Sequence, residues 1–384
     1  IGLGLRLLLD DVPPHVQASD PEAPLMFMAG PLAGTAAPSS SNLAVVALNR
    51  NTPYAAATGH SHGFWAAYLK HAGYDGVVFT GRAAKPSYLW IDDDHVELRD
   101  ASSFWGLDTR ETERRIKLEL GDEERISVAC IGPAGEAMLP GASIKNERNH
   151  GASKGSLGAS MGSTHLKAVA VRGSREVPLA HREWFVEVCG RWEDAILAPR
   201  GPGEGMPALG ALVKDGGTMR IYNLIGAQHI LAAKNWTDPV WGQEHGERMA
   251  EEAKQWVITP RESYNCPISC SYDCNVTTGP FAGLTASLCG GGENIEGASA
   301  MIGVEDPGTC VALTEHCDAI GIDSSVVGGL LGMAYELFER GVLTTRDTEG
   351  LELRWGNHQE AMTLLDQMCS GEGFGGRVLA KGLT

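Results

Sequence analysis

Three cysteines are concentrated in one short, turn-rich part of the chain. They follow the pattern Cys266-x3-Cys270-x3-Cys274 among Pro, Asn and Ser residues, and Cys289 comes fifteen residues after the third. Thiolates are preferred ligands of iron–sulfur clusters and of zinc, so this concentration favours metal ligation over core packing. The spacing differs from the paired CxxC motifs of a zinc ribbon. The segment therefore predicts a metal or cluster site.

Two other interpretations of these cysteines stay open. A free cysteine is commonly a small buried hydrophobe. A disulfide framework is disfavoured because a chain of 384 residues does not need stapling, nine cysteines leave one unpaired, and no secretory segment is seen. The cysteine usage indicates a reducing compartment, the cytoplasm.

The charge of the chain limits its partners. A net charge of −17 and a pI near 5.1 argue against binding to nucleic acid or to anionic membranes, since either needs a basic face. No run approaches the roughly twenty apolar residues that span a bilayer, which predicts a soluble protein without a transmembrane segment. Any anionic substrate must meet local Lys or Arg side chains.

The pattern of apolar residues predicts an α+β protein with two parts. Residues 1–174 contain short β-branched runs at 43–48, 76–80, 88–91, 126–131 and 168–171, typical of strands in a mixed sheet. Residues 175–384 show helical periodicity at 184–192, 309–320, 326–340 and 358–368. The residues at both ends of the sequence resemble the interior of a longer chain, so we expect a fragment that lacks its chain ends.

Three glycine-containing segments in the first part expose backbone N–H groups and small hydroxyls. They are Gly30–Thr35, Thr58–Gly63 and Gly151–Gly158. Such loops suit oxygen-rich anions such as phosphate. None of them is a P-loop, and no GxGxxG motif follows a strand with the acidic residue of a dinucleotide site. Each alone is compatible with an ordinary turn, but together they predict a ligand site.

Several collinear motifs resemble the tungsten-containing aldehyde ferredoxin oxidoreductase family. The motifs are Gly30-Pro-Leu-Ala-Gly-Thr35, Leu69-Lys-His-Ala-Gly-Tyr-Asp75, Lys85-Pro-Ser-Tyr-Leu89, Ile131-Gly-Pro-Ala-Gly-Glu136, Gly158-Ala-Ser-Met-Gly-Ser163 and Asp318-Ala-Ile-Gly-Ile-Asp323. The resemblance implies a saddle-like β-rich domain under two pyranopterins, followed by mainly α-helical domains. It also implies one tungsten or molybdenum between the pterins, a nearby [4Fe-4S] cluster, and magnesium as a candidate bridge between the pterins.

Matching to the family's motifs assigns candidate site residues. The expected pterin contacts are His60, Ser61, Gly63, Ser153, Lys154, Gly155, Asp318 and Asp323. The family's cluster spacing is C-x2-C-x3-C with a fourth cysteine far downstream. Cys266 and Cys270 match its second half, whereas Ser263 stands at the first cysteine. Cys274 is a candidate replacement, and the downstream ligand would lie beyond Thr384.

A second departure concerns the segment near the metal. Aldehyde-oxidising relatives carry Gly-Pro-Glu-Tyr-Glu there, whereas this chain has Cys289-Gly-Gly-Gly-Glu293. This looks like the catalytic subunit of the class II, ATP-independent benzoyl-CoA reductases, a branch of the same family. The resemblance implies Cys289 as a tungsten ligand, with His229 and Glu293 as candidate proton donors.

Three functions stay open. The first is reduction of the aromatic ring of benzoyl-CoA or a related arene-CoA, with electrons from an iron–sulfur subunit, within a larger flavin-containing complex or a homo-oligomer. The second is an aldehyde:ferredoxin oxidoreductase. The third is a non-catalytic pterin-binding or assembly subunit, suggested by Ser263 and by Asn42, which stands where aldehyde-oxidising relatives usually have Arg.

Overall fold

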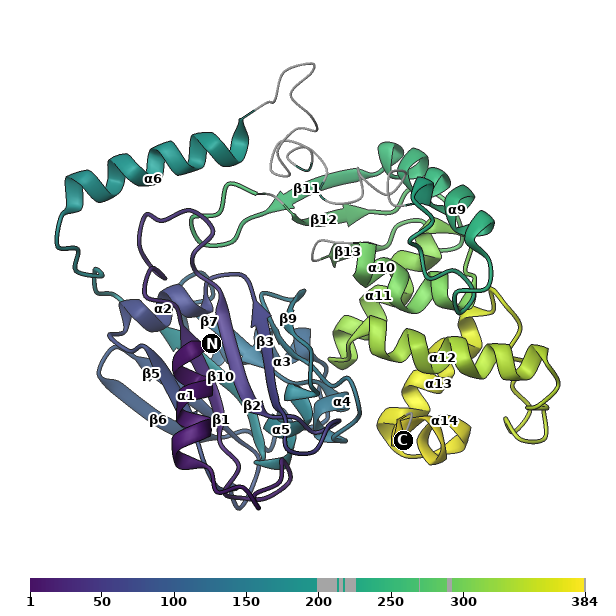
Figure 1. Cartoon of the computed structure of the whole chain (residues 1–384), viewed down its shortest axis with the longest axis horizontal. Helices are drawn as coiled ribbons and strands as arrows, with labels where there is room; N and C mark the ends of the chain where they lie inside the picture. The colour runs from purple at the N-terminus through teal and green to yellow at the C-terminus, as the bar shows by residue number, and fades with distance from the viewer. Residues whose placement is uncertain (199–212, 214–216, 218–225, 269, 289–291, 383–384) are drawn as a thin grey trace. The chain divides into compact units, whose positions relative to one another are not determined.

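The computed structural model describes residues 1–198, 213, 217, 226–268, 270–288 and 292–382. They form two compact units. Unit 1 comprises Ile1–Ala195 together with two returning segments, Glu262–Pro267 and Ala319–Ile322. Unit 2 comprises the remainder: Ile196–Arg261, Ile268–Asp318 and Asp323–Thr384. Unit 1 is rich in strands and unit 2 is mainly helical, which confirms the predicted α+β class (Figure 1).

Unit 1 contains two sheets. The four-stranded sheet is antiparallel, in the order β3-β2-β1-β4, with β1 (Leu25–Ala29), β2 (Leu43–Leu48), β3 (Ala56–Ser61) and β4 (Gly76–Phe79). The six-stranded sheet has the order β6-β5-β10-β7-β8-β9, and only its β5–β10 pair is parallel. Its strands are β5 (Ser87–Asp92), β6 (His95–Asp100), β7 (Ser127–Cys130), β8 (Ile144–Asn146), β9 (His150–Ala152) and β10 (Leu166–Arg172).

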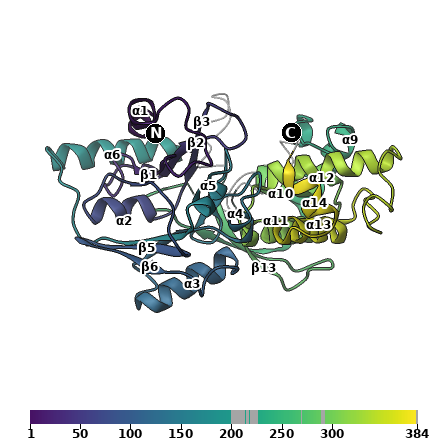
Figure 2. The same ribbon diagram turned by 90° about the horizontal axis from the view of Figure 1, so that it is seen from below.

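The helices of unit 1 cover the sheets in layers. α1 (Gly2–Asp11) packs Leu8 against one face of the four-stranded sheet. The other face shares a core with α2 (Trp65–His71) and the six-stranded sheet. Beyond that sheet, α3 (Thr109–Leu120) packs Ile116 against Tyr88 and Val128 (Figure 2). Alternate residues of β5 face the two cores, as a period of two requires. The shorter helices are α4 (Pro133–Glu136) and α5 (Leu157–Ser163), and α6 (Arg182–Leu197) follows the sheets.

Unit 2 combines helices with one small sheet. The antiparallel sheet has the order β11-β12-β13, with β11 (Val257–Arg261), β12 (Ser271–Asn275) and β13 (Thr285–Leu288). The helices are α9 (Pro239–Glu252), α10 (Gly292–Ser299), α11 (Pro307–Ile320), α12 (Ser324–Glu339), α13 (His358–Ser370) and α14 (Gly373–Arg377). Single turns of 3-10 helix lie at Ala253–Gln255, Ala300–Ile302 and Leu379–Lys381.

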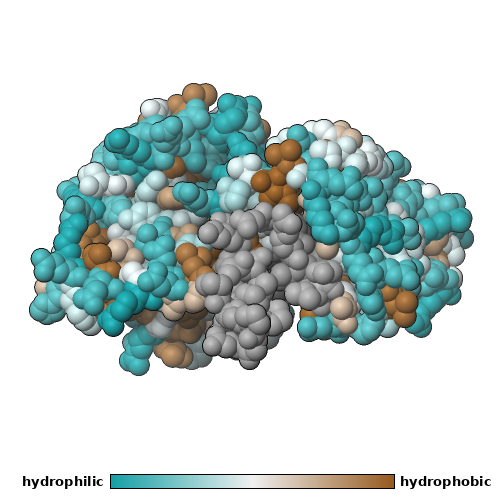
Figure 3. Space-filling view, turned by 90° about the horizontal axis from the view of Figure 1, so that it is seen from above, coloured by the Kyte–Doolittle hydropathy of each residue, from teal (hydrophilic) through white to brown (hydrophobic). Residues whose placement is uncertain are grey.

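The predicted elements are all present, with further strands beside them. The five predicted strands correspond to β2, β4, β5, β7 and β10, and the four predicted helices to α6, α11, α12 and α13. The sheet β11-β12-β13 in the second part was not predicted. Within the described ranges, no helix combines the length and apolarity that crossing a bilayer requires. The face in Figure 3 is mostly hydrophilic, with small scattered apolar patches.

Candidate functional site

The loop that follows β3 is fastened to β8 by buried hydrogen bonds. The hydroxyl of Ser61 donates to Oδ1 of Asn146, and Nδ2 of Asn146 donates to the carbonyl of His62 at 2.7 Å. Gly63 has a φ of +97°, and a Cβ at this position would lie 2.1 Å from Oε2 of Glu147. Position 63 therefore requires glycine for both its backbone conformation and its space.

The predicted loop at Ser153–Gly155 lies beside β3. Gly155 has a φ of +77°, and a Cβ there would lie 2.3 Å from Cβ of Ala57 on β3. The side chain of Ser153 is half-buried and that of Lys154 is exposed. The structure thus brings together two of the three glycine-containing segments that the sequence singled out, at 58–63 and 151–158.

Two polar residues next to these loops are fully buried. Among the described residues, neither polar side-chain atom of Asn149 has a hydrogen-bond partner, nor has the hydroxyl of Ser143, although both residues are 0% exposed. Ser143 precedes β8 and Asn149 precedes β9. Buried polar groups are normally paired, so unpaired ones point to a missing partner. Ser143 and Asn149 have no accessible surface, so the groups that fit an anionic cofactor of the pyranopterin kind are exposed Lys154 and the two glycine loops.

A buried acidic network supports the same loops, and sequence reasoning missed it. Ser127 donates to Oε1 of Glu147, while Glu113 accepts from Nζ of Lys117 at 2.6 Å and from N–H of Arg148 at 2.9 Å. Burial, reinforced by the negative charge of Glu113, raises the pKa of Glu147. The only signal in the sequence was the polar run 145–150 just before the predicted loop.

Three histidines surround the end of β3. His60 is exposed and pairs with Ala44 of β2. The rings of His62 and His150 lie 5.8 Å apart. His62 is surrounded by protein atoms although part of its surface stays exposed, and this desolvation, helped by the charges of His150 and His60, lowers the pKa of His62 to about 4. The ring of His62 is therefore neutral at physiological pH.

The cysteine-containing segment enters unit 1 only through Glu262–Pro267. The hydroxyl of Ser263 accepts from the N–H of Gly63 at 3.2 Å and lies 3.4 Å from Nε2 of His150. Sγ of Cys266 lies 3.1 Å from Oγ of Ser39. The segment thus attaches Ser263 to the loop after β3 and Cys266 to the loop between β1 and β2.

Cys270 and Cys274 belong to unit 2, whereas Cys266 belongs to unit 1. Cys274 lies on β12, paired with Ile258 and Ala286, and is 1% exposed. Four residues of extended chain span about 13 Å. Burial raises the pKa of the Cys274 thiol to about 12. The eight cysteines that the structure describes form no disulfide, and within the same ranges no three His, Cys, Asp or Glu side chains converge on a metal position.

The remaining predicted residues lie in unit 2. Asp318 is buried near the end of α11. Asp323 is the N-cap of α12, and its Oδ1 accepts from the N–H groups of Ser325 and Val326 at 2.9 and 3.2 Å. His229 is exposed, with Nδ1 3.3 Å from the carbonyl of Pro239. Glu293 lies in α10, but its side chain, like the whole of Cys289, falls outside the described residues.

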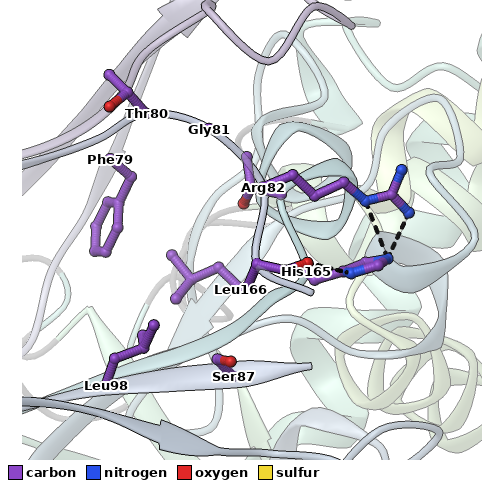
Figure 4. A pocket seen from close by; sticks show the side chains of 10 residues that line it. Phe79, Thr80, Gly81, Arg82, Ser87, Leu98, His165 and Leu166 are labelled. Carbon is purple, nitrogen blue, oxygen red and sulfur yellow. Dashed lines mark hydrogen bonds between the residues drawn. The ribbon is translucent and has the colours of Figure 1, made fainter. Parts of the chain in front are cut away.

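A separate pocket of about 340 Å³ lies beyond the far end of α5 in unit 1 (Figure 4). Arg82 donates to Nε2 of His165, whose Nδ1 lies 2.8 Å from the carbonyl of Ala83. Since a guanidinium only donates, Nε2 accepts and the ring proton is on Nδ1. No predicted site residue lines this pocket, whose walls are Phe79, Thr80, Gly81, Arg82, Ala83, Ser87, Leu98, Thr164, His165 and Leu166.

Two family profiles and several relatives of known name indicate the same protein family. The profile of the aldehyde ferredoxin oxidoreductase N-terminal domain matches residues 1–173, and that of domains 2 and 3 matches residues 205–384. Tungsten-containing aldehyde ferredoxin oxidoreductases of Pyrococcus furiosus and Thermococcus kodakarensis are each 34% identical over 99% of this chain. The chain spans about 61% of the length of these relatives.

A solved structure is similar over the whole chain. It is the active site complex BamBC of benzoyl-coenzyme A reductase in complex with 1,5-dienoyl-CoA. The TM-score is 0.84 at 29% sequence identity, with 100% of this chain and 57% of that chain covered.

Proposed function

Because the chain belongs to the aldehyde ferredoxin oxidoreductase family, we propose that it is part of a tungsten or molybdenum bis-pyranopterin oxidoreductase subunit with a [4Fe-4S] cluster. The proposed substrate is benzoyl-CoA or a related arene-CoA, whose ring is reduced to a cyclic diene with low-potential electrons. The observation that carries this choice is the similarity over the whole chain to the active site complex of a benzoyl-CoA reductase.

The proposed roles rest on the family's motifs and, for unit 1, on the geometry of its glycine loops. The proposed pterin contacts are the loops at 60–63 and 153–155, with the ammonium of Lys154 and backbone N–H groups other than that of Gly63, which donates to Ser263. Asp318 and Asp323 are further proposed contacts. When bound, the metal centre supplies the redox chemistry. Cys289 is its proposed thiolate ligand. His229 and Glu293 are the proposed proton donors.

Two other functions have support of their own. The relatives at 34% identity are aldehyde ferredoxin oxidoreductases, which favours an aldehyde substrate. Ser263 at the family's first cluster cysteine favours a non-catalytic pterin-binding or assembly subunit. For the first choice, the expected partners are an iron–sulfur electron-transfer subunit and a larger flavin-containing complex.

An assay of the full-length complex separates these functions. Benzoyl-CoA and a simple aldehyde are each supplied with a low-potential electron donor, and tungsten and molybdenum are measured in the same preparation. Activity on benzoyl-CoA is the expected result. Activity on the aldehyde alone would overturn the proposal, and a protein without either metal would favour the assembly role.

The ligand role of Cys289 has its own test. Cys289→Ala is expected to lower ring reduction at least about 100-fold and to reduce the bound metal, because a ligand is lost. Cys369→Ala, a change at a half-buried cysteine of α13, is the control and should leave both unchanged. Metal content and activity that both survive Cys289→Ala would contradict the assignment.

A further inference from the structure

We propose that Lys145 and Ser153 together bind one phosphate group in the space that the absent side chain of Gly151 leaves open. We call these three residues the Gly151 cradle. The inference rests on the proposed function, which supplies two ligands that carry phosphate, a pyranopterin and a coenzyme A thioester. It assigns a role to Lys145, which lies outside the motifs that resemble the family.

The register of two neighbouring strands places Lys145 opposite Gly151. Lys145 is the middle residue of β8 and Gly151 the middle residue of β9, and the two are direct partners in the antiparallel pair. Side chains of directly opposite residues lie on the same face of a sheet. Because position 151 is glycine, no side chain of β9 stands directly across from the lysine.

Two donors converge on the space above Gly151. A Cβ at this position would lie 3.1 Å from Nζ of Lys145 and 3.1 Å from Oγ of Ser153. Hydrogen bonds from such donors to oxygen are about 2.7–3.2 Å long, so one oxyanion bound there can accept from both. An ammonium carries three N–H groups, so Lys145 can serve a phosphate and keep other contacts as well.

The burial of Lys145 distinguishes it from the lysine that the loop itself carries. Lys145 is 4% exposed, whereas Lys154 is exposed. Gly151 and Ser153 are half-buried, so the cradle keeps accessible surface. Salt screens a buried charge less than an exposed one. The chain has a net charge of −17, so a phosphate depends on a local cation. We therefore expect Lys145 to contribute more to phosphate binding than Lys154.

The test compares the two lysines in the full-length protein produced in cells that cannot synthesise the pterin. The probe is inorganic pyrophosphate, and isothermal titration calorimetry measures its affinity. Lys145→Met is expected to weaken pyrophosphate binding at least about 10-fold, because a hydrogen bond to a charged group is lost. Lys154→Met is expected to weaken it less than about 5-fold, because an exposed charge contributes little.

Gly151→Ala tests the cradle without removing the ammonium. The added methyl group occupies the space for the phosphate, and the flexible ends of Lys145 and Ser153 can give way by a few tenths of an ångström, so the fold should persist. Pyrophosphate binding should again weaken at least about 10-fold, because the anion loses its hydrogen bonds to both donors. Gly190→Ala is the matched control in unit 1 and should bind as the wild type, because a Cβ there meets nothing within 4 Å.

The protein loaded with its cofactor identifies the source of the phosphate. Less bound pterin per protein in Lys145→Met than in the wild type would assign the phosphate to the cofactor. Unchanged pterin content with an affinity for benzoyl-CoA that falls at least about 10-fold would assign it to coenzyme A. If Lys145→Met changed neither quantity, the cradle would hold an adventitious ion only, and the inference would be overturned.

The remaining outcomes separate this inference from the proposed function. Equal affinity of wild type and Lys145→Met for pyrophosphate would overturn the cradle, and so would a wild type that does not bind pyrophosphate. None of these measurements requires turnover. A protein that binds pyrophosphate through Lys145 and retains its pterin through the same residue, but reduces no benzoyl-CoA, would keep the cradle and refute the proposed substrate.

Discussion

At the scale of single residues, His245 is a titratable side chain that is buried without a hydrogen-bond partner among the described residues. It lies on α9, is 0% exposed, and stacks on Trp241 with ring centroids 4.6 Å apart. Among the described residues neither ring nitrogen has a hydrogen-bond partner. Burial, with the nearby charge of Arg248, lowers the pKa of His245 to about 4. The folded protein therefore holds this ring neutral.

The lowered pKa of His245 predicts acid-dependent stability. Between pH 6.5 and about 4 the unfolded chain binds a proton that the folded chain does not, so the free energy of unfolding falls as pH falls. The shift corresponds to about 3 kcal/mol. His245→Phe keeps a stacked ring and should remove this part of the pH dependence, measured by urea unfolding at pH 7.5 and 4.5. Exposed His181→Phe is the control. Parallel pH profiles for wild type and His245→Phe would contradict the prediction.

At the scale of elements, two neighbouring glycines of α12 have different surroundings. A Cβ at Gly328 would lie 1.4 Å from the carbonyl oxygen of Gly297 on α10, whereas a Cβ at Gly329 meets nothing within 4 Å. The two helices approach at backbone distance, so only glycine fits at position 328. Packed interiors do not absorb an added methyl group without moving.

This contrast predicts opposite effects of the same substitution. Gly328→Ala should destabilise unit 2 by about 1–3 kcal/mol through overpacking. Gly329→Ala should stabilise α12 by about 0.5–1 kcal/mol, because glycine is a poor helix former. Urea unfolding followed by circular dichroism measures both. Equal effects of the two changes would show that α10 and α12 are not packed as described.

The predictable elements share a strong local signal. β2 and β10 carry runs of apolar and β-branched residues, and α12 has a long apolar periodicity with Gly341 at its end. β1 was missed because nearly every residue of it is buried, which removes the alternation of a half-exposed strand. β8 and β9 are three residues each and depend on their sheet partners.

The candidate site also has features that the sequence predicts and features that it does not. The glycine loops at 58–63 and 151–158 were predictable because glycine marks special backbone geometry. The contacts of Asn146 with Ser61 and of Ser263 with Gly63 join residues far apart in sequence. Nothing local encodes such pairs. Likewise, Cys274 pairs with Ile258 and Ala286 in its sheet, and the spacing of the cysteines does not encode these partners.

At the scale of the whole molecule, unit 1 is completed by residues from late in the chain. The N–H of Ser39 donates to the carbonyl of Asn265 at 3.0 Å, and the N–H of Ser143 donates to the carbonyl of Gly321 at 2.9 Å. Ala142 also bridges Ile322. The segments 262–267 and 319–322 therefore belong energetically to unit 1, although their neighbours in sequence belong to unit 2.

Hydrogen exchange should show whether the segment 262–267 opens together with unit 1. Gly155→Ala introduces a Cβ 2.3 Å from Cβ of Ala57 at a φ of +77°, and should destabilise unit 1 by about 1–3 kcal/mol. Amides exchange through opening of the cooperative unit that contains them. Peptides covering 262–267 should then exchange about 5- to 150-fold faster, together with β2 and β10, because free energies of about 1–3 kcal/mol convert to such factors. β12 and α12 should be unaffected.

Gly328→Ala supplies the reciprocal control for the exchange experiment. It should accelerate amide exchange in α12 and leave amide exchange in 262–267 unchanged, because its clash with Gly297 lies within unit 2. Suppose instead that the amide exchange rates of 262–267 changed together with those of β12 in both variants. The segment would then belong to unit 2, and the contacts of Ser263 with Gly63 would not persist in solution. The two glycine variants together thus decide whether Ser263 and Cys266 are held by the β-rich unit that carries the proposed pterin loops.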